Sequence, residues 1–236
     1  MPCSTHLPVA HSTARTRPQH TAPQLACDAH IHILDSSMDA RTPAHQDATV
    51  AQYQQLQSLL GTRRAVVVQP RPYGTDHRVT LDAIARLGLA QTRGIAVVHP
   101  DVSDQTLQEL HQGGIRGVRM SLYTAHNASV SFEMLEPLAD KVHAMGWHLQ
   151  LHWTADQIAQ HATTLLKLPV TLVFDHLARL PVPQGLTHPA YLVVRELLQQ
   201  GRAGFSQGES HVQKADGVLV PVFLTFNALP PDCGAA

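Results

Sequence analysis

The sequence predicts an α/β fold: an incomplete (β/α)8 barrel of the TIM-barrel type, with about six strand–helix units and an atypical C-terminal tail. Short β-branched runs alternate strictly with stretches of helical spacing, which is typical of parallel strands joined by helical crossovers. Several runs are almost entirely apolar, as expected for strands that are covered on both faces. Polar side chains recur at the ends of successive runs, and in a barrel those ends open on one mouth.

The expected strands are the runs at 27–34, 64–70, 93–100, 114–123, 146–153 and 170–177. The expected helices lie between and after them, at 52–61, 80–90, 103–114, 132–146, 156–168 and 188–201. A doubly wound open sheet is the alternative architecture. No Gly-x-Gly-x-x-Gly follows the first strand, which disfavours the dinucleotide-binding version of that fold.

Composition excludes several classes of protein. The chain has 236 residues, 44% of them hydrophobic, which is enough for one sizeable core. No window approaches the ~18 consecutive apolar residues of a membrane helix. The net charge is -1 and there is no long basic run, so neither nucleic acid nor a membrane is an expected partner. The 3 cysteines are odd in number and far apart, which favours a reducing compartment and predicts a cytoplasmic protein.

Three segments are expected along the chain. Residues 1–24 are rich in Pro, Thr, Ser, His and Arg, and we expect a disordered leader, with an organellar transit peptide as the alternative. Residues 25–203 hold the six strand–helix units. Residues 204–236 form a tail that lacks the alternation of the preceding units.

The first strand raises a chemical question. Alternating side chains of a strand share a face, so Asp28, His30 and His32 are expected on one side. That face is either a polar edge in water or the wall of a cavity that needs two imidazoles. Neutral imidazoles suit a zinc ion with an open water position, and without a metal they can polarise a carbonyl.

The motifs resemble those of a known family. The phrase DAHIHILD (28–35) resembles the His-x-His strand that begins the amidohydrolase superfamily. The phrases GIRGVRMSLY (114–123), LQLHW (149–153) and VFDHLARLP (173–181) are similar to its branch of pyrone-dicarboxylate and sugar lactonases. The likeness runs from about Cys27 to about Arg202.

The resemblance implies roles for individual residues. His30 and His32 would be metal ligands or donors to a carbonyl oxygen, and His176 would stabilise the oxyanion. Arg179 would bind a carboxylate, for which arginine geometry is well suited. Arg119 and His152 would contact substrate, with a structural salt bridge and a packed side chain as the respective alternatives. If a divalent metal such as zinc is bound, the ligands would be His30, His32 and His152; the cofactor expectation is therefore none or one such metal.

The function implied is a hydrolase that acts on a lactone or a related small carboxylated molecule. Two alternatives stay open: an inactive truncated homologue, and a metal-dependent decarboxylase of the same superfamily. The sequence gives no indication of the oligomeric state.

The likeness stops after residue 203. The family implies an eighth strand with an Asp that activates water, but no Ser-Asp-Trp phrase occurs here, and the acids that remain are Glu209, Asp216 and Asp232. We expect that the tail reflects a truncation or a shifted reading frame. The apolar run at 217–226 contains Pro221, so it is expected to pair at most as an edge strand. Activity of this chain is expected to be weak or absent.

Overall fold

Seven parallel strands form a curled half-barrel. The structure is a computed structural model that describes residues 17–19, 22–23, 25–42, 47–124 and 128–206, and the backbone alone of 210–213 and 219–222. The strands pair in chain order, each with the next. They are β1 (Cys27–Ile31), β2 (Arg64–Val68), β3 (Thr92–Ala96), β4 (Ile115–Ser121), β5 (His148–His152), β6 (Leu172–Asp175) and β7 (Ala203–Ser206). This arrangement confirms the predicted incomplete (β/α)8 barrel.

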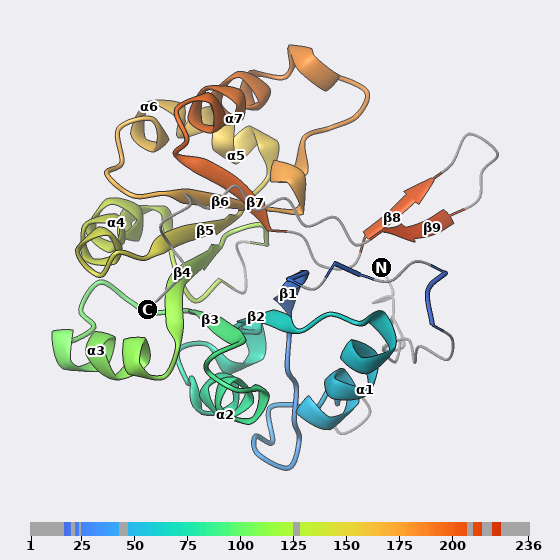
Figure 1. The fold of residues 1–236 in the computed structure, drawn as a ribbon. Coiled ribbons are helices and arrows are strands. Elements are labelled where there is room, and N and C mark those ends of the chain that lie inside the picture. The colour runs from blue at the N-terminus through green and yellow to red at the C-terminus, as the bar shows by residue number, and fades with distance from the viewer. Residues whose placement is uncertain are drawn as a thin grey trace, which may run out of the picture.

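Helices connect consecutive strands and flank the curled sheet (Figure 1). The α-helices are α1 (Val50–Leu60), α2 (Arg78–Leu87), α3 (Asp104–Gln112), α4 (Leu135–Ala144), α5 (Ala155–Gln160), α6 (Ala162–Leu165) and α7 (Pro189–Gln199). Four shorter turns are η2 (Arg71–Tyr73), η4 (Phe132–Met134), η5 (His176–Arg179) and η6 (Gly185–Thr187). None of the helices in the described part of the chain is long and apolar enough to span a membrane.

Local sequence sets where the helices begin. Thr49 caps α1 and Thr154 caps α5, each in a reciprocal pattern with a glutamine three residues on. Ser103 caps α3 by accepting a hydrogen bond from the Thr106 backbone N–H at 3.1 Å. Gly61 ends α1 in the left-handed conformation that glycine tolerates.

The structure differs from the expected elements in three places. β7 is a seventh strand at 203–206, just past the last expected helix. The expected helix at 156–168 is divided into α5 and α6 at His161, whose backbone leaves the helical conformation. The apolar tail run supplies β9 (Leu219–Val222), which pairs antiparallel with β8 (Ser210–Gln213) in a separate sheet. It therefore does not join the edge of the main sheet.

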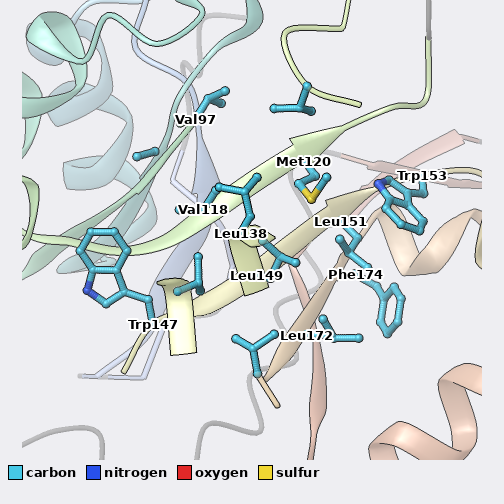
Figure 2. Packing of buried hydrophobic residues seen from close by; sticks show 14 of the residues in the cluster. Val97, Val118, Met120, Leu138, Trp147, Leu149, Leu151, Trp153, Leu172 and Phe174 are labelled. Atoms are coloured by element: carbon cyan, nitrogen blue, oxygen red, sulfur yellow. The ribbon is translucent and has the colours of Figure 1, made fainter. Parts of the chain in front are cut away.

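Alternation along the strands separates an apolar face from a polar one. Val118, Met120, Leu149, Leu151 and Phe174 belong to the buried core (Figure 2). The side chains that alternate with them along β4, β5 and β6 point to the opposite face of the sheet. These are the polar residues Arg119, Gln150, His152 and Asp175, and they are also buried. The fold thus covers one sheet face with helices and lines the other with polar groups.

Most of the expected leader lies outside the described residues, as do Glu209, Asp216 and Asp232.

Candidate active site

Four histidines from three strands meet at the mouth of the half-barrel. The His30 and His32 ring centroids are 5.0 Å apart and perpendicular. His176, which follows β6, lies 5.9 Å from His30 and 4.9 Å from His152 at the end of β5. The structure therefore brings together the four histidines that the sequence singled out.

Asp28 does not join this group, contrary to the expected shared face. Its carboxylate accepts a hydrogen bond from the Tyr53 hydroxyl of α1 at 3.3 Å. The β1–β2 pairing is irregular between Asp28 and Ile31, and the simple alternation of side chains is interrupted there. Burial is the main cause that raises the pKa of the Asp28 carboxyl above its usual range.

A buried carboxylate lies beneath the histidines. Asp175 is fully buried and accepts hydrogen bonds from Arg119 Nε at 2.9 Å and Gln150 Nε2 at 2.8 Å. Arg119 Nη2 completes the ion pair at 2.8 Å, and His30 Nδ1 lies 3.5 Å from the other carboxylate oxygen. Burial alone would raise the pKa of Asp175, but Arg119 and His30 hold it well below its usual range. Arg119 thus forms the structural salt bridge that was one of its two alternatives.

The turn that carries His176 and Arg179 has an unusual backbone. All four residues of η5 have φ between 50° and 58°, the left-handed region that non-glycine residues rarely adopt. Ala178 is buried, while Leu177 is 37% exposed. The turn brings Arg179 back over β5, where its Nη2 donates to His152 Nε2 at 3.1 Å.

Hydrogen-bond partners fix which nitrogen of His32 and of His30 carries the proton. His32 Nδ1 lies 2.8 Å from the Val68 carbonyl, which only accepts, so the proton is on Nδ1. Ser206 Oγ donates to the Ala29 carbonyl and therefore accepts from His30 Nδ1 at 3.1 Å. When either ring carries this single proton, its Nε2 atom is an acceptor.

The same reasoning applies to His152. Arg179 only donates, so the Nε2 atom of His152 is the acceptor and its Nδ1–H donates to Ser121 Oγ at 2.9 Å. Within the described residues, the ring of His176 makes no hydrogen bond. It remains able to donate from either nitrogen.

The surroundings of His32, His152 and His176 lower the pKa of each ring and favour its neutral form near pH 7. Burial, followed by Arg119, lowers the pKa of His152 to about 3. Burial lowers the pKa of His176 to about 4, and Arg179 acts in the same direction. The His32 ring is partly open to solvent, yet the atoms packed around it, then His30 and Arg119, also lower its pKa.

An open cavity of about 450 Å³ extends along the ends of β2 and β3, and none of the four site histidines lines it. Arg71, His99 and Ser129 are among its lining residues, and Arg71 donates to Thr124 Oγ1 at 2.6 Å. A narrower pocket continues from Arg71 to Arg119 and Ser121. The narrower pocket reaches the imidazoles through Ser121, whose hydroxyl accepts from His152 Nδ1.

Sequence reasoning missed several residues that shape the site. Ser206 on β7 fixes the His30 proton, and Tyr123 stacks on both His152 and Arg179. Ser206 lay beyond the expected units, so no motif pointed to it. Tyr123 ended the GIRGVRMSLY phrase, but nothing in that phrase indicates what its ring contacts.

The chain belongs to the amidohydrolase family, whose model matches residues 27–212. This match confirms the family indicated by the His-x-His and Asp-His-Leu-x-Arg phrases. It also covers β7 and part of the segment expected to fall outside the likeness.

Curated relatives include two hydrolases of lactone-type compounds. The chain is 30% identical over 190 residues to the 2-pyrone-4,6-dicarboxylate hydrolase of Comamonas testosteroni, covering 78% of this chain and 62% of that protein. It is 28% identical over 183 residues to the 4-sulfomuconolactone hydrolase of Hydrogenophaga intermedia, covering 73% and 58%. The chain thus spans about three fifths of the length of these relatives.

Two solved structures of amidohydrolase-type proteins match this chain. A probable 2-pyrone-4,6-dicarboxylic acid hydrolase from Acinetobacter baumannii, with citric acid bound, matches with a TM-score of 0.62 and 26% identity, covering 76% of this chain and 68% of that chain. A zinc-bound amidohydrolase from Burkholderia multivorans has a TM-score of 0.56, with coverage of 77% and 68%. At 14% identity, the second likeness shows the fold alone.

The side chains fit a three-histidine metal site only in part. The acceptor Nε2 atoms of His30 and His32 suit a metal, because metal-bound histidines commonly donate their other N–H to a carbonyl or carboxylate. His152 does not fit, since Arg179 donates to its Nε2 atom. No group of three His, Cys, Asp or Glu side chains in the described ranges is arranged to hold a metal ion.

Proposed function

We propose that this chain carries a lactonase-type site for a small, carboxylated cyclic ester. The observation that carries the proposal is the convergence of His30, His32, His152 and His176 with Arg179 at one mouth. Neutral imidazoles and a fixed cation are the groups that an anionic ester requires. The relatives that hydrolyse a pyrone dicarboxylate and a sulfomuconolactone support this substrate class.

Each side chain of the proposed site has a role that follows from whether it donates or accepts hydrogen bonds. His176 is the donor to the ester carbonyl oxygen and to the oxyanion that forms there, because its neutral ring has an N–H to offer. His30 and His32 present acceptor Nε2 atoms, so in neutral form they receive hydrogen bonds from ligand or water. Arg179 binds the carboxylate of the substrate. Arg119 holds Asp175 and contributes positive potential from below.

An alternative is a homologue with an impaired reaction. Asp175 is the carboxylate nearest to the imidazoles in the described residues, and Arg119, Gln150 and His30 occupy its oxygens. It is therefore a poor base for water. A decarboxylase is the other alternative, and it would release CO2 instead of opening a ring.

The test is a comparison of anionic and neutral lactones as substrates. In a version of the chain that is extended by the C-terminal region of a longer relative, Arg179→Ala should raise KM for carboxylated lactones by about ten- to hundred-fold, since a hydrogen bond to a charged group contributes about 1.5–3 kcal/mol. KM for neutral lactones should stay within about two-fold, because they lack the group that Arg179 binds. Arg195→Ala, an exposed position on α7, is the control.

The same reactions are followed for ring-opened acid and for CO2. Equal effects of Arg179→Ala on both lactone classes would contradict the substrate assignment. Release of CO2 without ring opening would favour the decarboxylase.

A further inference from the structure

Tyr123 connects the carboxylate-binding arginine to the sheet. Its ring lies under the Arg179 guanidinium, with 3.9 Å from Cζ to the ring centroid. The same ring stacks on His152, with centroids 5.1 Å apart and an angle of 20° between the planes. Tyr123, His152 and Arg179 therefore form a closed cluster in which each side chain contacts the other two.

The backbone sets the position of Tyr123. The His152 carbonyl accepts from the Leu122 N–H at 3.1 Å and from the Tyr123 N–H at 2.9 Å, where β4 leaves the sheet. Tyr123 is 40% exposed, so its ring forms part of the outer wall of the mouth. A ring held at the end of a strand is a firmer support for a cation than a side chain on a free loop.

The guanidinium that rests on this ring is incompletely paired. Arg179 Nη2 donates to His152, but the buried Arg179 Nε–H has no hydrogen-bond partner among the described residues. A buried, unmatched N–H of a cation is costly, and an acceptor oxygen of a ligand would satisfy it. With one face against Tyr123, the guanidinium can receive such a ligand only along its edge or on its other face.

We propose that Tyr123 is a positioning residue, whose aromatic face holds Arg179 in the orientation that binds a ligand carboxylate. The inference rests on the proposed function only in taking the ligand to be a small carboxylate. Attraction between a guanidinium and an aromatic face contributes a modest amount to binding, and most when the pair is shielded from water. Loss of the ring leaves the charge in place but removes its orientation.

The experiment measures the dissociation constant of citrate by calorimetry, with the full chain and its variants. Tyr123→Leu should weaken binding by roughly three- to thirty-fold, the range expected for a cation–π contact. Tyr123→Phe keeps the ring and should remain within about two-fold of the unchanged protein. Tyr191→Leu is the matched control, because it removes a second arginine–tyrosine contact, with Arg195 on α7.

Salt dependence distinguishes positioning from loss of charge. In Tyr123→Leu the citrate affinity should fall while its dependence on NaCl stays the same, since Arg179 remains charged. Arg179→Ala should lower both the affinity and the salt dependence. Triethyl citrate, which carries no carboxylates, should bind all variants equally.

The outcomes are distinct. Equal affinities for Tyr123→Leu and the unchanged protein would overturn the inference, and so would an equal loss in Tyr123→Phe or Tyr191→Leu. Failure of the unchanged protein to bind citrate would overturn it as well. If citrate binding depends on the Tyr123 ring while a version extended by the C-terminal region of a longer relative opens no lactone, the positioning role stands and the proposed function fails.

Discussion

At the scale of single residues, the chemistry of the mouth depends on buried ionic partners more than on exposed ones. Asp175 is fully buried, and its carboxylate pairs with the Nε and Nη2 atoms of Arg119. Pairing two charges in a protein interior gives a small net gain, but removing one partner leaves the other buried and uncompensated.

Asp175→Asn should therefore lower the free energy of unfolding by about 3–5 kcal/mol, the cost of leaving Arg119 unpaired. Urea unfolding at pH 7 measures it. The control is Asp82→Asn, which breaks an exposed pair with Arg86 on α2 and should cost at most about 0.5 kcal/mol. Similar losses for both variants would show that burial does not set the value of the Arg119 pair.

The ring of His148 couples the stability of the fold to pH. Burial lowers its pKa to about 4, against an ordinary value near 6.5. Between these values the unfolded chain binds the proton and the folded chain does not. The contribution of His148 to the free energy of unfolding is therefore fully present above pH 6.5. It falls as the pH drops toward 4, by up to about 1.4 kcal/mol per pH unit.

His148→Gln should remove this contribution, and the slope of stability against pH should become shallower by about 1 kcal/mol per unit between pH 6 and 4. His143→Gln, at an exposed position on α4, is the control. Urea unfolding at four pH values gives both slopes. An unchanged slope in His148→Gln would mean that this ring titrates normally in the folded protein.

At the scale of elements, the turn η5 combines strain with function. Its four residues are all left-handed, which costs about 1–2 kcal/mol for each residue that is not glycine. The same turn delivers His176 and Arg179 to the mouth. Strained backbone of this kind persists where the surrounding structure holds it, and here Ala178 is packed in the core.

Leu177→Gly should relieve part of that cost and raise the free energy of unfolding by about 0.5–1 kcal/mol, after the extra entropy of glycine in the unfolded chain is subtracted. Leu177→Ala is the matched control, because it shortens the same exposed side chain and keeps the backbone cost. Thermal and urea unfolding compare the two variants. A glycine variant no more stable than the alanine variant would contradict the presence of strain at this residue.

The strands were predictable because their signal is local. Alternation and β-branched runs placed β1 to β6 within a few residues of the observed strands. Asp28 was placed on the wrong face because an irregularity in pairing depends on the neighbouring strand, not on its own sequence. β7 was missed since it has four residues, two of them Ala203 and Gly204, which carry little strand preference.

At the scale of the whole molecule, the order of strands made the grouping of the histidines predictable. Parallel strands in sequence order bring their C-terminal ends to one side, so the positions of His30, His32, His152 and His176 follow from topology. The contacts between individual side chains could not be predicted from the topology. The ring of Tyr123 under Arg179 and the hydroxyl of Ser206 at His30 depend on rotamers and on the path of the chain after β4 and β6.

The part of the family fold that this chain spans bears on its catalysis. Hydrolysis of an ester at neutral pH needs a base within hydrogen-bond reach of the attacking water, and such a base contributes ~10²–10⁴-fold. In the described residues the carboxylate nearest to the histidines is Asp175, and three neighbours occupy it. The relatives are longer than this chain, which spans 62% of the Comamonas testosteroni protein.

We therefore expect weak or no lactone hydrolysis by the 236-residue chain. A chimera in which the C-terminal region of the Comamonas testosteroni protein replaces the residues after 203 should be faster by about 10²-fold or more if that region carries the eighth-strand Asp that the family resemblance implies. Both proteins are assayed on the same carboxylated lactones at equal folded concentration, with citrate binding as the control for an intact mouth. Comparable turnover by the two would show that a base already present in this chain activates the water, and that the acceptor Nε2 atoms of His30 and His32 are the groups to test next.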